Sequence, residues 1–329
     1  MNNRILRWGL LGTARINRAL IAPLRASARN ELVAVASRTI ERAEAYAREW
    51  NIPRAIGSYE AMLADPDVDV VYIPLPNGLH AEWTIKAAQA GKHVLCEKPL
   101  AVTPGEVDAM AAAAQQAGVV VAEAFMYRHH PQTFSVKQLV DDGAIGRLRL
   151  VRGSFTFSLT RAVDVRLDPA LSGGSIWDVG CYPISYARYV IGGEPLEAFG
   201  WQVIGASGVD EVFAGQLRFA GDVYAQFDCG FRAPFRTHLE IVGSDGTIVV
   251  PRPFKPGLDE QIHLARGDRT ETMVIPGQEL YIGEVEDMAD AILNGQTPRV
   301  SLEDSRGNVA TIVALLRSAH EGRPMPVPG

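Results

Sequence analysis

The first 125 residues alternate short apolar segments with amphipathic segments, and this alternation limits the fold more than any other feature of the chain. The apolar segments are rich in valine, isoleucine and leucine, as in ELVAVAS at residues 31–37 and DVVYI at residues 69–73. The segments between them have helical periodicity, as in TIERAEAYAREW at residues 39–50. Such an alternation predicts a parallel sheet that is covered by helices on both faces.

Six strands and five helices are expected in this region. The strands are predicted near residues 7–12, 31–37, 55, 69–73, 93–96 and 119–122. The first helix follows the first strand and is predicted to end near residue 26. The other four are predicted at residues 39–50, 58–64, 79–90 and 103–118. The last of these begins with Thr-Pro-Gly-Glu, which has the spacing of a capping box with proline at the first helical position.

The pattern changes after residue 126, where residues alternate between polar and apolar along strands such as LRLVRGSFTFSL and VYAQFDCGF. This period of two predicts a mostly antiparallel sheet, with helices near residues 132–141, 281–294 and 301–320. A chain of 329 residues is long for one hydrophobic core. We therefore predict an α/β protein with a doubly wound domain at residues 1–125 and a second domain at residues 126–329.

Composition excludes several classes of partner. The chain is 47% hydrophobic and 21% charged, with a net charge of -6 and no dense cluster of lysine and arginine, so neither nucleic acid nor a membrane is an expected partner. The three cysteines are far apart and form no disulfide or metal-binding pattern. The N-terminal sequence has no signal-peptide pattern. We expect a cytoplasmic protein that requires no metal.

The first strand-to-helix turn has features of a dinucleotide-binding site. It contains Gly12, Thr13, Ala14, Arg15 and Ile16 in the pattern G-x-A-x-x-N. In such a turn, backbone N–H groups and a helix N-terminus approach the pyrophosphate. The pattern departs from G-x-G-x-x-G, and by itself it is equally typical of an ordinary turn.

Two residues at the end of the second strand indicate which dinucleotide is bound. An NAD-binding domain usually has an acidic residue here, but this chain has Ser37 and Arg38. A guanidinium group binds the 2′-phosphate of NADP well. We therefore predict NADP rather than NAD, with a solvated Arg38 as the alternative.

The ends of strands four and five provide further candidates, because ligands bind at the carboxyl ends of parallel strands. Glu97 and Lys98 follow the strand HVLC, and Pro99 would fix the turn that directs Lys98 toward the ligand. From position alone, Lys98 is equally well interpreted as a solvated lysine. The cofactor residues predicted after strand four are Leu75, Pro76, Asn77 and His80. Asn77 could instead cap a helix and His80 could be a satisfied first-turn histidine.

Several segments together resemble one family. GLLGTARI, PLPNGLHAEW, GKHVLCEKPL, EAFMYRHHP and SGGSIWDVGCYPIS occur in the order found in the glucose-fructose oxidoreductase and inositol dehydrogenase (Gfo/Idh/MocA) family. The resemblance implies a Rossmann domain followed by an α/β domain whose open antiparallel sheet often forms the oligomer interface. It therefore implies a homodimer or homotetramer, and it makes Lys98 the lysine beside the nicotinamide and the substrate.

The resemblance also points to Asp178 and Tyr182 in the second domain. Many members carry Asp-x-x-x-His there, but this chain has tyrosine in the histidine position, as do dimeric dihydrodiol dehydrogenases and NADP-dependent xylose dehydrogenases. A free tyrosine has a pKa of about 10, which a nearby ammonium group lowers. Our hypothesis is that Tyr182 is the general acid/base, that Lys98 tunes it, and that Asp178 positions substrate hydroxyls or Lys98. The alternative places Tyr182 in the core and Asp178 at a helix N-cap.

Three further residues are candidates for substrate contact. Tyr127 follows the domain crossover, Arg166 could bind sugar hydroxyls, and Trp177 could stack on a sugar face, although tryptophan is more often core. The combined prediction is an NADP(H)-dependent oxidoreductase that acts on a hydroxyl or carbonyl carbon of a sugar or polyol. A trans-dihydrodiol substrate is one alternative, and a cofactor-binding sensor without turnover is another.

Overall fold

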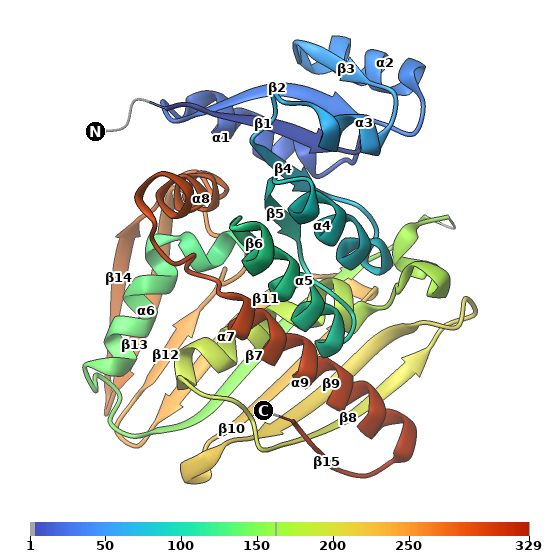
Figure 1. The fold of residues 1–329 in the computed structure, drawn as a ribbon. Coiled ribbons are helices and arrows are strands. Elements are labelled where there is room, and N and C mark those ends of the chain that lie inside the picture. The colour runs from blue at the N-terminus through green and yellow to red at the C-terminus, as the bar shows by residue number, and fades with distance from the viewer. Residues whose placement is uncertain (1–3, 162, 329) are drawn as a thin grey trace. The chain divides into compact units, whose positions relative to one another are not determined.

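The computed structural model describes residues 4–161 and 163–328 and divides the chain into two compact units (Figure 1). Unit 1 comprises Met1–His129 and Tyr281–Ser305, and unit 2 comprises His130–Leu280 and Arg306–Gly329. The return of the C-terminal segment to unit 1 differs from the predicted division at residue 125.

Helix α8 (Ile282–Asn294) explains this return to unit 1. Its residues Val285, Met288 and Ala289 are buried in the same hydrophobic core as the strands of unit 1. On the polar side of the helix, the Nη1 atom of Arg29 donates a hydrogen bond to Asp290 at 2.6 Å. Apolar burial and an ion pair therefore both attach α8 to unit 1.

Unit 1 contains a six-stranded parallel sheet in the order β3-β2-β1-β4-β5-β6. This is the strand order of a doubly wound dinucleotide-binding fold, so the predicted fold class is confirmed for this half. The strands are β1 (Leu6–Leu11), β2 (Asn30–Ala36), β3 (Arg54–Ile56), β4 (Val70–Ile73), β5 (His93–Glu97) and β6 (Val121–Ala124). The α-helices between them are α1 (Asn17–Ala26), α2 (Ile40–Trp50), α3 (Tyr59–Ala64), α4 (His80–Gln89) and α5 (Pro104–Ala117).

Local capping sets the ends of several of these helices. Thr39 and Ser58 accept backbone hydrogen bonds at the N-termini of α2 and α3. The predicted capping box is present at α5, where Thr103 and Glu106 satisfy each other's backbone N–H groups. Gly118 ends this helix with a φ of 66°, a left-handed conformation that glycine adopts without strain.

Unit 2 contains a nine-stranded sheet in the order β14-β13-β12-β11-β7-β10-β9-β8-β15. Strands β7 and β10 are parallel and the other neighbouring pairs are antiparallel, which agrees with the predicted mostly antiparallel sheet. The strands are β7 (Leu148–Ser158), β8 (Glu197–Ile204), β9 (Asp210–Arg218), β10 (Tyr224–Gly230), β11 (Arg232–Gly243), β12 (Thr247–Val250), β13 (Asp259–Arg266), β14 (Arg269–Pro276) and β15 (Met325–Pro326). The other α-helices are α6 (Pro131–Asp141), α7 (Cys181–Ile191) and α9 (Leu302–Glu321).

Helices α6 and α7 pack against this sheet, while its other face carries large apolar side chains in the open. Trp201 on β8 is 59% exposed, Tyr224 on β10 is 45% exposed and Val274 on β14 is 59% exposed. Their pairing registers place all three on that outer face. Within residues 4–161 and 163–328, no helix has the length and hydrophobicity needed to cross a membrane.

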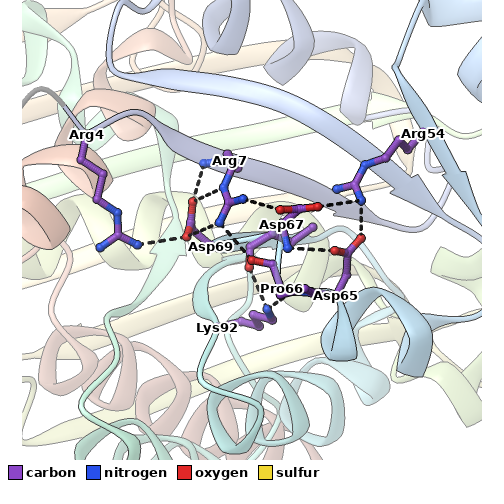
Figure 2. Close-up of polar contacts among 9 residues, drawn as sticks. Arg4, Arg7, Arg54, Asp65, Pro66, Asp67, Asp69 and Lys92 are labelled. Atoms are coloured by element: carbon purple, nitrogen blue, oxygen red, sulfur yellow. Dashed lines mark hydrogen bonds and ion pairs between the residues drawn. The ribbon is translucent and has the colours of Figure 1, made fainter.

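A network of charged residues lies at the amino ends of the parallel strands in unit 1, opposite the edge where ligands bind (Figure 2). Asp69 accepts hydrogen bonds from the backbone N–H and the guanidinium of Arg7, both at 3.0 Å, and one from Arg4. Lys92 donates to the carbonyl oxygens of Asp65 and Val68. These contacts hold the loop before β4 against the starts of β1 and β5.

We expect the Asp69→Asn substitution to destabilise unit 1 by about 1–2 kcal/mol at pH 7, after discounting for the partial exposure of its arginine partners. Hydrogen bonds from Arg7 lower the pKa of Asp69 to about 2, more than offsetting the effect of burial. A depressed carboxyl pKa contributes stability that is complete above the unfolded value of about 4 and is lost as the pH falls toward 2. Urea unfolding of both proteins between pH 7 and pH 2 measures this difference.

Asp67→Asn is the matched control, since Asp67 also pairs with Arg7 but its side chain is 65% exposed. It should cost less than about 0.5 kcal/mol. A difference between Asp69→Asn and wild type that stays constant down to pH 2 would show that the lost stability does not come from the carboxylate.

Candidate active site

The turn between β1 and α1 is built around Gly12. Its φ of 126° suits glycine, and a Cβ atom added there would lie 3.3 Å from the Leu75 side chain. The Gly12 N–H donates to Ala36, and its carbonyl accepts from the Asn17 side chain at 2.9 Å. Asn17 stands where the usual motif has its third glycine, and its buried side chain closes the turn. The predicted cofactor residues between Gly12 and Asn17 are Thr13, Ala14, Arg15 and Ile16, which lead into the N-terminus of α1.

Positive charge gathers at the carboxyl end of β2, beside this turn. Ser37 is buried, and its backbone N–H donates to the Ile56 carbonyl, whereas Arg38 is exposed in the loop between β2 and α2. Arg42 lies in the first turn of α2 and donates from its Nε atom to the Thr13 hydroxyl at 2.8 Å. Burial raises the pKa of Tyr59, while the charges of Arg38 and Arg42 act in the opposite direction. Two arginines and a tyrosine therefore lie near one another beside the glycine turn.

Sequence reasoning did not identify Arg42 or Tyr59. Arg42 lies in the first turn of α2, and the start of this helix follows the carboxyl end of β2, so a basic residue in that turn was a usable signal. No local pattern marked Tyr59, which approaches the glycine turn from the start of α3.

His80 is an internal link between two loops. It is fully buried at the start of α4, with Nδ1 2.7 Å from the Pro99 carbonyl and Nε2 2.6 Å from the Leu75 carbonyl. Burial is the first cause that lowers its pKa, and the charge of Lys98 lowers it further. A neutral ring has one N–H and donates to one of these carbonyls. The structure thus supports the satisfied-histidine alternative over a direct cofactor contact.

The other predicted residues after β4 form the short turn before His80. The Leu75 side chain lies where it would contact a Cβ atom on Gly12. Pro76 is the N-cap of a 3₁₀ turn, and Asn77 is the first residue of that turn. The capping alternative for Asn77 therefore stays open. Contact of these residues with a cofactor stays a prediction.

The backbone on both sides of Lys98 is fixed by two glutamates, the half-buried Glu97 and the buried Glu123. Glu97 accepts a hydrogen bond from the Tyr72 hydroxyl at 2.5 Å and one from the Lys98 backbone N–H at 3.2 Å. Beyond Pro99, the Leu100 N–H donates to Glu123 at 2.8 Å. Glu97 is thus held by the Tyr72 hydroxyl and by the Lys98 backbone N–H, and these contacts help to position Lys98.

Asp178 and Tyr182 lie on one helical segment of unit 2. Asp178 belongs to a π-helical turn (Ile176–Gly180) that runs into α7, and Tyr182 is the second residue of α7. Pro183 has no N–H to donate, and π-turns of this kind are frequent at functional sites. Tyr182 is 5% exposed and packs against the rings of Phe155 and Phe254, with centroids 5.3 and 5.7 Å away.

Arg166 forms ion pairs with two aspartates. Its Nε atom donates to Asp178 at 2.6 Å and its Nη1 atom to Asp164 at 3.2 Å. The charge of Asp178 is the largest cause that raises the pKa of Arg166, so the guanidinium remains cationic. We predicted that Arg166 binds sugar hydroxyls, but the structure shows that it first holds Asp178. Asp178 lies within the π-turn, whose N-cap is Ser175, and its carboxylate is paired with Arg166. These observations disfavour the alternative in which Asp178 is a helix N-cap.

The two predicted aromatic contacts are buried. Tyr127 is fully buried and packs edge-on against Phe125, and Trp177 is 7% exposed. This burial fits the core alternative for Trp177, and a role in substrate contact stays a prediction for both residues. In the described part of the chain, no group of three His, Cys, Asp or Glu side chains is arranged to hold a metal ion.

The predicted site residues thus form two groups. The cofactor residues and Lys98 come together at the carboxyl edge of the sheet in unit 1, while Asp178, Arg166 and Tyr182 lie within unit 2.

Family models match both halves of the chain. The model described as an oxidoreductase family with an NAD-binding Rossmann fold matches residues 6–125, and the GFO/IDH/MocA C-terminal domain matches residues 134–249. The chain belongs to the GFO/IDH/MocA oxidoreductase family. The family resemblance seen in the sequence is therefore confirmed.

Relatives with stated activities cover most of the chain. A D-xylose 1-dehydrogenase (NADP(+)) from Haloferax volcanii is 39% identical over 96% of this chain and 98% of its own. A trans-1,2-dihydrobenzene-1,2-diol dehydrogenase from Danio rerio is 36% identical over 75% of this chain and 74% of its own. A 3-ketoreductase from Actinomadura kijaniata, solved with NADP and TDP-benzene, has a TM-score of 0.91 and 32% identity over 96% of this chain and 98% of its own.

Proposed function

We propose that the protein is an NADP(H)-dependent oxidoreductase that transfers hydride between the nicotinamide and a C–OH or C=O carbon of a sugar or polyol. The observation that carries the proposal is the pair Arg38 and Arg42 beside the glycine turn of an oxidoreductase-family Rossmann unit. The xylose dehydrogenase and 3-ketoreductase relatives support a sugar substrate.

The residues of unit 1 fit NADP at each part of the cofactor. The Gly12 turn and the N-terminus of α1 suit the pyrophosphate. Arg38 and Arg42 suit the 2′-phosphate, since arginine forms bidentate contacts with phosphate oxygens. Lys98 lies after β5, at the same sheet edge as the Gly12 turn. When bound, the nicotinamide accepts or donates the hydride.

In this proposal, the remaining chemistry comes from residues of unit 2 and from the charge of Lys98 in unit 1. Tyr182 takes or gives the hydroxyl proton at the reacting carbon, with its ring held by Phe155 and Phe254. Lys98 supplies a positive charge that favours the phenolate form of a tyrosine. Asp178, held by Arg166, accepts hydrogen bonds from substrate hydroxyls.

Two other functions have support of their own. The relative from Danio rerio favours a trans-dihydrodiol substrate, which undergoes the same oxidation of a C–OH group. A cofactor-binding sensor would keep the fold without turnover. The presence of both Lys98 and Tyr182 favours an enzyme, because a sensor has no need of an acid/base.

The deciding experiment measures NADP⁺ reduction at 340 nm by the purified protein, with aldoses, polyols and trans-dihydrodiols as substrates and NAD⁺ in parallel. NADPH oxidation with ketosugars tests the reverse direction. Turnover of sugars with preference for NADP⁺ is the expected result. Tight NADPH binding without turnover of any substrate in either direction would favour the sensor.

We further propose a homodimer or homotetramer that forms through the outer face of the nine-stranded sheet. The exposed Trp201, Tyr224 and Val274 support it, because they distribute large apolar side chains across the uncovered face of the sheet. The three cysteines are buried thiols, which fits the proposed cytoplasmic, reducing location.

We expect Trp201→Lys to weaken self-association by about tenfold or more, since the substitution places charge at an apolar contact. Analytical ultracentrifugation over a range of concentrations measures the effect. Leu258→Lys is the control. Leu258 is an exposed apolar residue (66%), but it precedes β13 and so lies outside the strands that form the proposed interface. Monomers of wild-type protein at all concentrations would refute the proposal.

A further inference from the structure

A single buried carboxylate anchors the segment that leads into the π-turn of Asp178. Asp210, the first residue of β9, is 4% exposed. Its Oδ2 atom accepts hydrogen bonds from the Ser175 hydroxyl at 2.6 Å and from the Ile176 backbone N–H at 2.9 Å. A Cβ atom on Gly174 would lie 2.3 Å from its Oδ1 atom. Three consecutive residues therefore fit closely around the Asp210 carboxylate.

The placement of this segment determines where the helix begins. Ile176 is the first residue of the π-turn, which continues into α7 without a break. The Asp178 N–H donates to the Gly174 carbonyl at 3.1 Å. Because a continuous helix transmits a shift at its start to the residues that follow, the contacts of Asp210 set the positions of Asp178 and Tyr182.

Strand β10 supports the same segment through Cys229. The Cys229 sulfur lies 3.8 Å from the Ser175 hydroxyl, and a Cβ atom on Gly180 would lie 2.8 Å from it. Two neighbouring strands thus hold the helix start.

The chemistry of Asp210 is unusual for a purely structural residue. No ion pair involves Asp210 within residues 4–161 and 163–328, and burial raises its pKa to about 6 although its hydrogen bonds act in the opposite direction. The titratable group that faces it from β10 is Cys229, whose pKa is raised by burial, so that thiol is neutral. A buried carboxylate without a cation costs stability that an asparagine in its place would not.

We propose that Asp210 is a positioning residue that fixes the start of the π-turn and thereby aligns Asp178 and Tyr182 with the substrate. The role of Tyr182 rests on the proposed function. Asp210 acts in this role through its hydrogen bonds with Ser175 and Ile176.

The test compares Asp210→Ala, Asp210→Asn and the control Glu211→Gln, which alters the next residue on β9. We expect Asp210→Ala to lower kcat by about tenfold or more, because small displacements of reacting groups slow catalysis strongly. The Kd for NADPH should stay within about twofold, since the cofactor residues lie in unit 1. Asp210→Asn keeps one acceptor oxygen and should recover most of kcat at pH 7, whereas Glu211→Gln should resemble wild type.

The pH profile separates positioning from general stability. In wild type, kcat should fall as the pH drops below about 6, because a protonated carboxyl accepts hydrogen bonds less well. The part of this decrease that comes from Asp210 should be absent in Asp210→Asn, whereas the part that comes from protonation of the proposed base Tyr182 should remain in both proteins. If Asp210→Ala does not fold, Ser175→Ala removes one of the two hydrogen bonds and should give a smaller loss of kcat.

Hydrogen–deuterium exchange provides a readout that needs no activity. The amides of residues 174–182 should exchange at least about tenfold faster in Asp210→Ala and at the wild-type rate in Glu211→Gln. If the wild-type protein turns over no sugar, the proposed function is contradicted. The hydrogen–deuterium exchange of the variants still tests whether Asp210 holds the helix start. Active wild type with unchanged kcat in folded Asp210→Ala would overturn the inference and leave the proposed function in place.

Discussion

Replacing Tyr182 with phenylalanine is expected to lower kcat for sugar oxidation by about 10²-fold or more, the usual contribution of a general acid/base. The substitution removes only the hydroxyl, so the ring contacts with Phe155 and Phe254 are retained. Steady-state kinetics with saturating NADP⁺ measures kcat, and fluorescence titration measures the Kd for NADPH. This Kd should change by less than about twofold, because the cofactor residues belong to unit 1.

Tyr189→Phe provides the matched control for this experiment. Tyr189 lies on the same helix, α7, and is half-buried. We expect the kcat of Tyr189→Phe to stay within about twofold of wild type, as for a substitution away from the reacting atoms. Wild-type turnover in Tyr182→Phe would remove the tyrosine from the mechanism, and equal losses in both variants would assign the effect to packing of the helix.

Features that depend on neighbouring residues were predictable from the sequence. The strand-to-helix alternation of residues 1–125 predicted the parallel sheet, and the caps at Thr103 and Gly118 predicted the bounds of α5. The same reasoning placed Arg38 at the carboxyl end of β2, since the position of a residue after a strand determines the sheet edge at which it lies.

Features that depend on distant pairing were not predictable in this way. The apolar face of α8 showed that the helix is buried, but not that its partner sheet lies more than 150 residues earlier. The Arg166 and Asp178 pair joins a loop to a π-turn, and neither has a period that predicts contact. Asp210 on β9 accepts a hydrogen bond from Ser175, which lies 35 residues earlier at the start of a helix, and so left no local signal.

His80 illustrates a third case, in which the sequence located a residue but left its role open. The first turn of α4 was predicted correctly, and both a cofactor contact and an internal hydrogen bond suited that position. The placement of the Pro99 carbonyl, on the loop after β5, favours the internal hydrogen bond. The family motifs at residues 74–80 and 97–99 are therefore joined physically, because a buried histidine of one holds the backbone of the other.

Replacing both Arg38 and Arg42 with alanine is expected to raise the Kd for NADP⁺ by about 10²- to 10³-fold. A hydrogen bond to a charged group contributes about 1.5–3 kcal/mol, and the two side chains flank the proposed 2′-phosphate position. Each single variant should lose about tenfold or more. The Kd for NAD⁺, which lacks this phosphate, should change by less than about threefold. Isothermal titration calorimetry with both cofactors measures the effect.

Arg48→Ala controls for the loss of positive charge on the same helix. Arg48 is exposed in the last turn of α2 and pairs with Glu44, away from the glycine turn. Its removal should leave both Kd values within about twofold of wild type. The selectivity ratio decides the assignment. Equal weakening of NADP⁺ and NAD⁺ in the double variant would mean that Arg38 and Arg42 support the fold of the site rather than the phosphate. A loss confined to NADP⁺, and diminished at high salt, would mean that this pair of charges selects the cofactor, because salt screens an exposed ion pair but leaves the glycine turn unchanged.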